Sequence, residues 1–403
     1  MAPRSEKWVV LGGGYGGLAF ASRWAHHHRE LSRRLNKVPR LYMITSSAHS
    51  DCTCELYRTL RSGEHQVFDI PKLFRRKPVE VREGRVFEID PRAKLLRMRG
   101  ETREDFKYDR LIVATGATRL RTDLVGLEDL LQHQNPLEPR IFHARSNKQV
   151  SELRYALRRL GWQNKSAKKD QFVVILGGGA TGVEMAGEIA AMRERRSSGR
   201  VIIVEGRYEP LKPALGTLAH KLLREQMRKM GIEYFEGSSA KRVDAKHLHL
   251  ENGQMIPWDL LVVAQGSSPD VKLFGEFGDM WTEQQQIKVA RDFHIEDWSG
   301  HYALGDLAHY PWAKQELPRT AQVASQQGTY LADLFAAELL GEKAPSTGFR
   351  WQNWGYLVSL GPTHGAGKLG PLPLPVVWGP AVDVAKRGAR WRFDAEVFSG
   401  LRL

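Results

Sequence analysis

Two short stretches of the chain carry glycines at the spacing that suits the phosphates of a dinucleotide. In each stretch three glycines in the pattern GxGxxG follow an apolar, strand-forming run: Gly12, Gly14 and Gly17 after Val9–Leu11, and Gly177, Gly179 and Gly182 after Val173–Leu176. Glycine lets the chain turn tightly into a helix, allows main chain to approach a pyrophosphate, and leaves the helix N-terminus facing that anion. One such pattern would be weak evidence, but two with matching flanks predict two dinucleotide sites.

The residues that end the next strand of each unit indicate which dinucleotides are bound. Glu205 ends the strand 200–205, where its carboxylate can accept hydrogen bonds from an adenosine ribose and repel a 2′-phosphate. This favours NADH, although Arg207 leaves NADPH open. Thr45 and Ser46 stand at the corresponding place in the first unit, where an acid is usual, so we expect a weakened or rearranged adenosine contact. Because a bound flavin needs an electron donor, we predict FAD in the first site and NADH in the second.

The elements that position these residues are repeated as whole domains. The segments 108–118 and 258–268 are both apolar strands that end in small residues and glycine: Ala114, Thr115 and Gly116 in the first copy and Gly266 in the second. Each copy also holds alternating segments with turn residues, which predict a small antiparallel meander. We therefore predict an α/β fold with two Rossmann-like dinucleotide-binding domains, each with such a meander, and a short C-terminal region.

Composition and cysteine content limit the alternatives. The chain has 403 residues, of which 42% are hydrophobic, enough for two or three domains with their own cores. Its two cysteines, Cys52 and Cys54, exclude a disulfide framework and a four-cysteine metal site and favour a reducing, cytoplasmic setting. No apolar run is long enough to span a bilayer, and glycines interrupt the N-terminal run too early for a signal peptide. The consecutive histidines His26–His28 point to different sides of a helix, so we expect no metal site.

The formal net charge of +14 has two interpretations, a solvated basic exterior and an anionic lipid surface. The basic clusters lack the interleaved aromatic residues of a single-strand binder, so we expect no nucleic acid partner. The stretch 375–393 mixes Val, Trp and Phe with Lys386, Arg387, Arg390 and Arg392, which suits a helix lying on lipid headgroups. A basic helix docked on the protein itself is the alternative. Peripheral attachment to the inner face of the cell membrane is thus one prediction, and a homodimer stays open.

The order of motifs along the chain resembles one family. The two glycine turns are followed by ATG at 114–116, ALGDLAHY at 303–310 and LPRTAQVASQQG at 317–328. This set is similar to that of the type II NADH dehydrogenases, the single-subunit, non-proton-pumping NADH:quinone oxidoreductases of the two-dinucleotide-binding-domain flavoproteins. The resemblance covers roughly Trp8 to Leu360. It implies an FAD-binding domain from residues 1–120 and 285–345, an NADH-binding domain at 145–284 inserted in the first, and a membrane-facing C-terminal region at 346–403.

The resemblance also implies residues for the flavin site. Gly305 would leave room for the flavin chain, and Asp306 would contact FAD, as the aspartate of this motif does in the family. Thr320 and Ala321 would open a helix whose N-terminus faces the flavin and stabilises negative charge on the reduced ring.

Three polar residues are candidates for the reaction itself. Gln322 and Gln326 lie four residues apart and share a helix face, so their amides can bond to quinone oxygens, with a polar helix surface as the alternative.

Glu184 is expected in the first turn of its helix, where the helix dipole keeps the carboxylate charged. In the family this glutamate lies near the nicotinamide, with roles in holding NADH and relaying protons. A plain helix N-terminal acid is the alternative, and Glu188 one turn on could share the task.

Cys52 and Cys54 leave two interpretations open. Relatives that reduce disulfides carry a redox cysteine pair in this region, but with two or four residues between the cysteines, whereas a single intervening residue would give a strained bridge. We therefore expect structural thiols, with a thiol relay as the alternative.

Together these features predict an FAD-dependent oxidoreductase that passes hydride from NADH to the flavin and then two electrons to a quinone. Two alternatives belong to other classes. A soluble NADH-dependent flavoprotein reductase of a protein or peroxide acceptor would not associate with lipid, and a non-enzymatic dinucleotide-binding scaffold would purify colourless.

Overall fold

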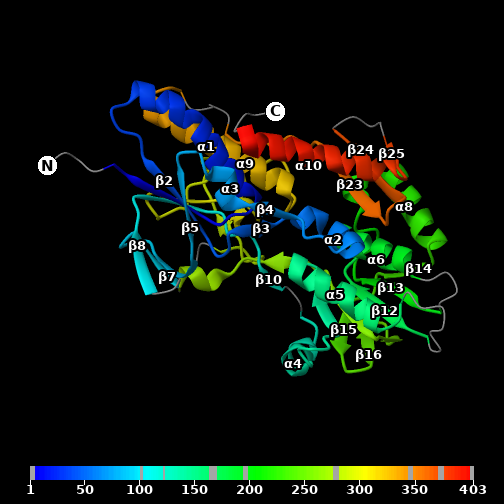
Figure 1. Cartoon of the computed structure of the whole chain (residues 1–403). Helices are drawn as coiled ribbons and strands as arrows, with labels where there is room; N and C mark the ends of the chain where they lie inside the picture. The colour runs from blue at the N-terminus through cyan, green and yellow to red at the C-terminus, as the bar shows by residue number, and fades with distance from the viewer. Residues whose placement is uncertain are drawn as a thin grey trace.

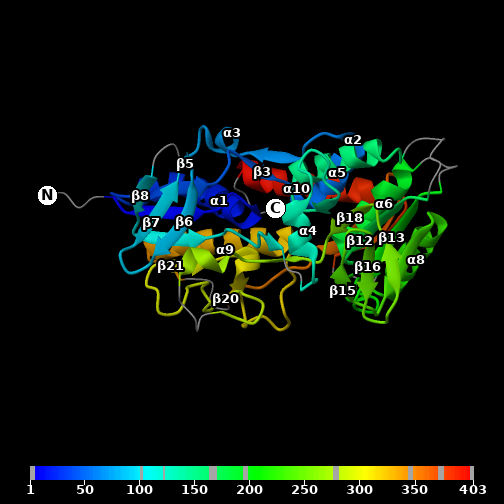
Figure 2. The same cartoon turned by 90° about the horizontal axis from the view of Figure 1, so that it is seen from below.

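Two five-stranded parallel sheets with helices packed against them form the two halves of the computed structural model (Figure 1). The structure describes residues 5–99, 103–120, 123–162, 170–193, 198–275, 281–343, 348–370 and 376–399. The halves lie side by side in an elongated molecule, with the first sheet toward one end and the second toward the other (Figure 2). The predicted α/β fold class is confirmed.

The first sheet has the strand order β21-β9-β1-β2-β5, and all neighbouring strands are parallel. Its strands are β1 (Lys7–Leu11), β2 (Arg40–Thr45), β5 (Val79–Glu83), β9 (Arg110–Val113) and β21 (His301–Ala303). Every residue from Trp8 to Leu11 is buried, as expected for a central parallel strand covered on both faces. Since β21 comes from much later in the chain than β9, two distant segments build this sheet.

Two long helices, α1 (Tyr15–Arg34) and α9 (Ala321–Leu340), pack on each other beside the first sheet. Glycine at position 328 allows this close approach, since a Cβ there would overlap the main chain of Gly16. Further along, Arg23 of α1 bonds to Asp333 of α9 at 2.5 Å. The two helices therefore run in the same direction, and their N-termini lie at the same end of the sheet.

The second sheet repeats the pattern with the order β11-β18-β12-β13-β14, again parallel throughout. Its strands are β11 (Ile141–His143), β12 (Phe172–Leu176), β13 (Arg200–Glu205), β14 (Ile232–Glu236) and β18 (Leu260–Val263). The helices of this half are α5 (Asn147–Arg159), α6 (Ala180–Met192), α7 (Lys212–Leu215) and α8 (Thr217–Lys229). The repeat seen in the sequence is thus a repeat of one βαβ architecture.

Each half carries a three-stranded antiparallel meander, as the sequence predicts. They consist of β6 (Arg85–Asp90), β7 (Leu95–Arg99) and β8 (Arg103–Lys107), and of β15 (Ala240–Val243), β16 (His247–Leu250) and β17 (Met255–Pro257). A short antiparallel pair, β10 (Arg119–Leu120) with β19 (Ser267–Ser268), joins the two halves. The remaining short elements of these regions are α4 (Leu127–His133), η2 (Val271–Phe274), β20 (Ile287–Lys288), η4 (Gly305–Leu307) and β22 (Ala308–His309).

The connection between β2 and β5 reaches from the first half into the second. It contains β3 (His49–Asp51), η1 (Thr53–Glu55), α2 (Leu56–Ser62), β4 (Val67–Asp69) and α3 (Ile70–Phe74). Side chains of α2 join the hydrophobic core of the second sheet, where the helix contacts α5 and α6. Consequently α2 ties the two dinucleotide-binding halves together.

The C-terminal region forms a three-stranded antiparallel sheet and a helix. These are β23 (Gly355–Leu360), β24 (His364–Leu369), β25 (Val376–Trp378) and α10 (Ala381–Ser399). The sheet packs on α6 and α8, and α10 runs from that sheet back to α1, so that it bridges the two halves along one edge of the molecule (Figure 1). Within the described ranges, no helix is both long enough and apolar enough to cross a bilayer.

Candidate active site

The two glycine turns have the same backbone geometry. Gly12 has a φ of +113° and Gly177 one of +107°, and a Cβ at either position would lie 2.5 Å from the carbonyl oxygen of the neighbouring strand end, so only glycine fits. By contrast, a Cβ on Gly14 or Gly179 would meet no atom within 4 Å. The tight glycines shape the turn while the open ones expose main chain at the start of a helix, which is the cradle that a pyrophosphate requires.

The third glycines, Gly17 and Gly182, let helix pack on strand. A Cβ on either would overlap the carbonyl of the first glycine of its own turn. The small residues that end the neighbouring strands complete the cradles: positive-φ Gly116 and Gly266 also face open space. Both sites therefore fit a dinucleotide by geometry as well as by sequence.

Glu205 lies at the end of β13 with its carboxylate turned toward the second cradle. One oxygen accepts a hydrogen bond from the Gly178 N–H at 2.8 Å, and the other accepts from the Arg207 N–H at 2.9 Å. The Arg207 guanidinium also bonds to Glu205 at 3.3 Å while its side chain stays largely exposed. The Glu205 carboxylate is thus fixed beside the turn, where a ribose diol is expected, and the Arg207 guanidinium lies next to this carboxylate.

Thr45 takes the equivalent position at the end of β2. Its hydroxyl donates to the Ser47 carbonyl at 3.1 Å and lies close to Gly13, where the second cradle has Glu205 close to Gly178. Because this hydroxyl already donates its hydrogen, it can form fewer hydrogen bonds to a ribose than a carboxylate can. The altered adenosine contact that the sequence predicts stays a prediction.

The expected flavin-site residues gather around the N-terminus of α9. Thr320 caps this helix, since its hydroxyl accepts from the Val323 N–H at 3.3 Å, and Ala321 is the first helical residue, as predicted. Asp306 lies in the short turn η4, and Gly305 donates its N–H to the Gln327 amide oxygen at 2.7 Å. Burial raises the pKa of Asp306, and the positive charges of nearby arginines only partly offset this.

Gln322 and Gln326 share one face of α9, as predicted, but their amides have main-chain partners. Gln322 donates to the Gly355 carbonyl at 3.0 Å and accepts from the Trp354 N–H at 2.8 Å. Gln326 makes a matching pair of bonds to Gln352, each 2.9 Å long. The two amides therefore hold the segment that enters β23, and their contact with a quinone stays a prediction.

The expected setting of Glu184 is wrong in one respect. It is the fifth residue of α6 and lies beyond the first turn, so the helix dipole is not what stabilises its charge. Its carboxylate is buried and accepts from Lys386 Nζ of α10 at 2.5 Å and from the Ser359 N–H at 3.2 Å. The Tyr57 ring lies 4.0 Å from the same ammonium. An ion pair with a residue far along the chain takes the place of the dipole.

The Glu184–Lys386 pair is held away from water. Burial raises the pKa of Glu184, and the attraction of Lys386 and the hydrogen bonds only partly counter it. For Lys386, burial alone would lower the pKa, but Glu184 and Tyr57 outweigh it, so the pKa is raised. Such a pair stores a proton on the ammonium and has a carboxylate beside it that can take one up.

Glu188, one turn further along α6, has a different partner from Glu184. It is buried and bonded to the Arg61 guanidinium of α2 at 2.5 Å, so it is committed to the contact between α2 and α6. Arg61 also lies 3.6 Å from Asp383 at the start of α10. A role of Glu188 beside Glu184 stays a prediction.

The basic residues of α10 were expected to face lipid, and the structure turns two of them inward. Lys386 pairs with Glu184, and Arg390 bonds to Glu55 at 2.8 Å and to Asp394 at 2.7 Å. Composition suggested a basic helix but could not show which long-range partners neutralise it. Of the apolar side chains, Val382 and Val397 of α10 are buried, whereas Val384 and Trp391 of α10 and Trp378 of β25 are 64%, 70% and 62% exposed.

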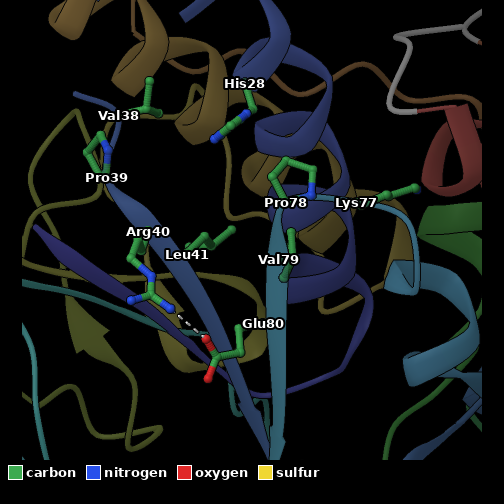
Figure 3. A pocket seen from close by; sticks show the side chains of 9 residues that line it. All are labelled: His28, Val38, Pro39, Arg40, Leu41, Lys77, Pro78, Val79 and Glu80. Carbon is green, nitrogen blue, oxygen red and sulfur yellow. Dashed lines mark hydrogen bonds and ion pairs between the residues drawn. The ribbon is translucent and has the colours of Figure 1, made fainter. Parts of the chain in front are cut away.

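A separate cavity lies at the amino ends of β2 and β5, lined by His28, Val38, Pro39, Arg40, Leu41, Lys77, Pro78, Val79 and Glu80 (Figure 3). Cofactors of parallel sheets bind at the carboxyl ends of the strands, so this cavity lies away from the cradles. Its cations are already engaged, since Arg40 pairs with Glu80 at 3.2 Å and Lys77 donates to the Val397 carbonyl at 2.7 Å. Across the described part of the chain, no cluster of His, Cys, Asp and Glu could hold a metal ion.

Comparison with known proteins decides the family. A family model described as pyridine nucleotide-disulphide oxidoreductase matches residues 6–328, which is most of the chain. The chain belongs to this family. As a member of the pyridine nucleotide-disulphide oxidoreductases it is an oxidoreductase, and FAD and NADH are the pair that its two cradles fit.

Two relatives illustrate the range of this similarity. The chain is 28% identical over 251 residues to a probable NADH dehydrogenase of Dictyostelium discoideum, an alignment that covers 57% of the chain and 52% of that protein. It is 27% identical over 392 residues to the demethylphylloquinone reductase of Synechocystis, with 94% and 89% covered. The chain thus spans about half the length of the Dictyostelium protein.

Among solved structures, the fold is similar to that of NDH2 from Plasmodium falciparum in complex with NADH, with a TM-score of 0.79. The identity is 15%, with 96% of this chain and 94% of that chain covered. At this identity the similarity concerns the fold, which is shared over nearly the whole of both chains.

Proposed function

We propose that the protein is an FAD-dependent NADH:quinone oxidoreductase. The observation that carries the proposal is the pair of open glycine cradles in one chain, because two dinucleotides in one protein allow hydride to pass between them. The motif order of the type II NADH dehydrogenases and the demethylphylloquinone reductase among the relatives support a quinone as the acceptor.

The proposed domains are those that the sequence predicts: residues 1–120 and 285–345 for FAD, residues 145–284 for NADH, and 346–403 as the C-terminal region. When bound, FAD would accept a hydride from NADH and release electrons to the quinone. Its pyrophosphate would lie at Gly12 and Gly14, and Asp306 and the N-terminus of α9 would contact the rest of the molecule. Glu205 would bind the ribose of NADH.

We assign proton supply to the buried Glu184–Lys386 pair. Quinone reduction takes up protons as well as electrons, and Lys386 Nζ holds a proton in a place screened from water. Glu184 Oε1, 2.5 Å away, keeps the ammonium charged between turnovers. Proton donation by a positioned side chain contributes roughly 10²–10⁴-fold to a rate.

We further propose that α10 and β25 rest on the membrane surface. Trp378, Val384 and Trp391 are exposed apolar side chains on neighbouring elements, and a quinone is itself dissolved in lipid. The positive net charge of the chain favours an anionic leaflet.

The visible spectrum tests the proposal. Purified protein should show bound oxidised flavin, NADH added without oxygen should bleach it, and a soluble quinone analogue should restore it. Colourless protein that takes up no FAD would support a scaffold instead. Flavin that NADH bleaches and quinone does not reoxidise would point to another acceptor.

A further inference from the structure

Two arginines reach across from one half of the molecule to the other, a feature that the proposed function does not use. Arg145 lies shortly after β11 of the second half, and its guanidinium donates to the Ala117 carbonyl, just beyond β9 of the first half. Arg319 precedes α9 of the first half, and its Nη1 donates to the Ser267 carbonyl of β19 at 2.9 Å. Each half thus contributes one arginine that binds the main chain of the other half. We call Arg145 and Arg319 the interdomain arginines.

The interdomain arginines bind the loops that complete the two cradles. Ala117 directly follows Gly116, and Ser267 directly follows Gly266. Both glycines have a positive φ and face open space, as described above. The same two loops continue into the antiparallel pair of β10 and β19, which joins the halves. The arginines and this short pair of strands therefore fix the two cradle loops relative to each other.

Both interdomain arginines also act on Asp306, the carboxylate that we assign to FAD. Burial raises the pKa of Asp306, and the charges of Arg319 and Arg145 counter this rise. Arg319 is moreover the residue before Thr320, which caps the helix whose N-terminus we assign to the flavin. All three charged side chains are half-buried. Two cations and one carboxylate give this group a net positive charge next to the assigned flavin site.

This arrangement suits a hydride transfer between two dinucleotides in two ways. Reduction by hydride places negative charge on a flavin, and a cation in a half-buried, poorly screened position stabilises such a charge. Hydride transfer also needs a donor and an acceptor that are held in a fixed relative orientation. The interdomain arginines bring positive charge to the assigned flavin site and connect the loops of the two cradles.

We propose that Arg145 and Arg319 are positioning residues that fasten the NADH-binding half to the FAD-binding half and raise the reduction potential of the flavin. This inference rests on the proposed function, because that function supplies the flavin and the nucleotide. The order of motifs along the chain did not indicate it, since Arg145 lies outside the motifs and meets Ala117 only across the two halves.

The first test measures the reduction potential of bound FAD by equilibration with a reference dye, which needs no NADH. Arg145→Met and Arg319→Met should each make the flavin harder to reduce, by roughly tenfold in the equilibrium constant, or about 30 mV. Arg145→Lys and Arg319→Lys keep the charge, so their potentials should stay close to that of the unaltered protein. The inference is wrong if the methionine variants keep the original potential, or if the lysine variants shift as far as the methionine variants.

Arg154→Met is the matched control for the loss of a charge and of a contact between elements. Arg154 of α5 reaches to α2, where its Nη1 donates to the Leu60 and Arg61 carbonyls at 2.6 and 2.7 Å. Its replacement removes the same charge and comparable hydrogen bonds without touching either cradle loop. The flavin potential should therefore stay unchanged. A shift as large as that of the other methionine variants would show that net charge alone sets the potential, which would overturn the inference.

Hydrogen exchange tests the fastening of the two halves separately. Loss of either interdomain arginine should speed amide exchange across β10 and β19, because the loops that carry these strands lose a contact with the opposite half. Arg154→Met should leave exchange in these two strands as it is. Equal exchange in all the variants would contradict the fastening role, even if the flavin potential changed.

The failure of this inference can be told apart from failure of the proposed function. If NADH bleaches the flavin and a quinone reoxidises it while all variants share one potential, only the inference fails. If FAD is bound but NADH does not bleach it, the proposed function fails, and the dye measurement still decides whether the arginines raise the potential. Protein that takes up no FAD would remove both.

Discussion

The Glu205 carboxylate does two things at once, since it holds the second glycine turn through the Gly178 N–H and faces the expected ribose. We predict that Glu205→Ala raises the KM for NADH roughly tenfold, about 1.4 kcal/mol, because a charge-assisted hydrogen bond is lost. The KM for NADPH should fall, since Arg207 loses its carboxylate partner. Initial rates with both nucleotides measure this, with Glu251→Ala on the second meander as control. An unchanged preference would show that Glu205 only shapes the turn.

Thr45 offers the opposite experiment in the first cradle. Thr45→Glu should place a carboxylate near the Gly13 main chain, as Glu205 lies near Gly178. The gain in FAD binding should be on the order of 1 kcal/mol, or about fivefold in Kd. Equilibrium dialysis of released flavin would measure it, with Thr45→Gln as the uncharged control. Weaker retention in the glutamate variant would mean that the strand end is placed differently from that of β13.

The Glu184–Lys386 pair predicts a stability that depends on pH. In Lys386→Met, Glu184 loses its partner, so burial raises the pKa of Glu184 further. The folded protein then keeps a proton on Glu184 that the unfolded chain releases near pH 4.5. The free energy of unfolding should therefore be largest at low pH and should fall as pH rises from 4.5 through the raised pKa. Urea titrations at several pH values test this, and the loss at neutral pH should be about 3–5 kcal/mol. Adding Glu184→Gln should remove this dependence of the unfolding free energy on pH. A dependence that remains in the double variant would mean that another group causes it.

At the scale of elements, α9 holds the C-terminal segment through two glutamines. Gln322→Leu or Gln326→Leu should speed amide exchange across 352–355, because the main-chain groups lose their partners. We expect NADH bleaching of the flavin to stay intact and reoxidation by a soluble quinone to slow. Hydrogen exchange and stopped-flow traces of each half-reaction measure both effects, with exposed Gln132→Leu on α4 as control. Slowed reduction with normal reoxidation would move the glutamines to the nicotinamide side.

The elements also show what sequence could predict. The glycine turns and the strands before them follow from local rules, since a tight βα connection leaves few choices of residue. The partner of Lys386 does not, because Lys386 of α10 meets Glu184 of α6 only after the whole chain has folded. For the same reason composition left open whether α10 lies on lipid headgroups or docks on the protein, whereas the structure buries Lys386 against Glu184 and exposes Trp391. Local patterns predicted the cradles, and long-range packing decided the rest of the site.

For the whole molecule, the outward tryptophans predict membrane binding. The protein should sediment with vesicles that contain anionic lipid, and the double variant Trp378→Ser/Trp391→Ser should bind on the order of tenfold more weakly as buried apolar area is lost. Trp312→Ser, at a position that is 49% exposed and away from α10, is the control. Equal sedimentation of all variants would leave charge as the sole attraction, and binding should then vanish in high salt.

The origin of β21 affects how the protein is made. During synthesis β1, β2, β5 and β9 emerge first, but the outer edge of β9 has no partner until His301–Ala303 leave the ribosome. At about 5–20 residues per second, that edge waits on the order of ten to forty seconds while the second half is translated and can fold. An unpaired strand edge is a template for aggregation, so we expect the nascent chain to be most prone to aggregate during this interval. Of the two parallel sheets, the one that is synthesised first is therefore the one that is completed last.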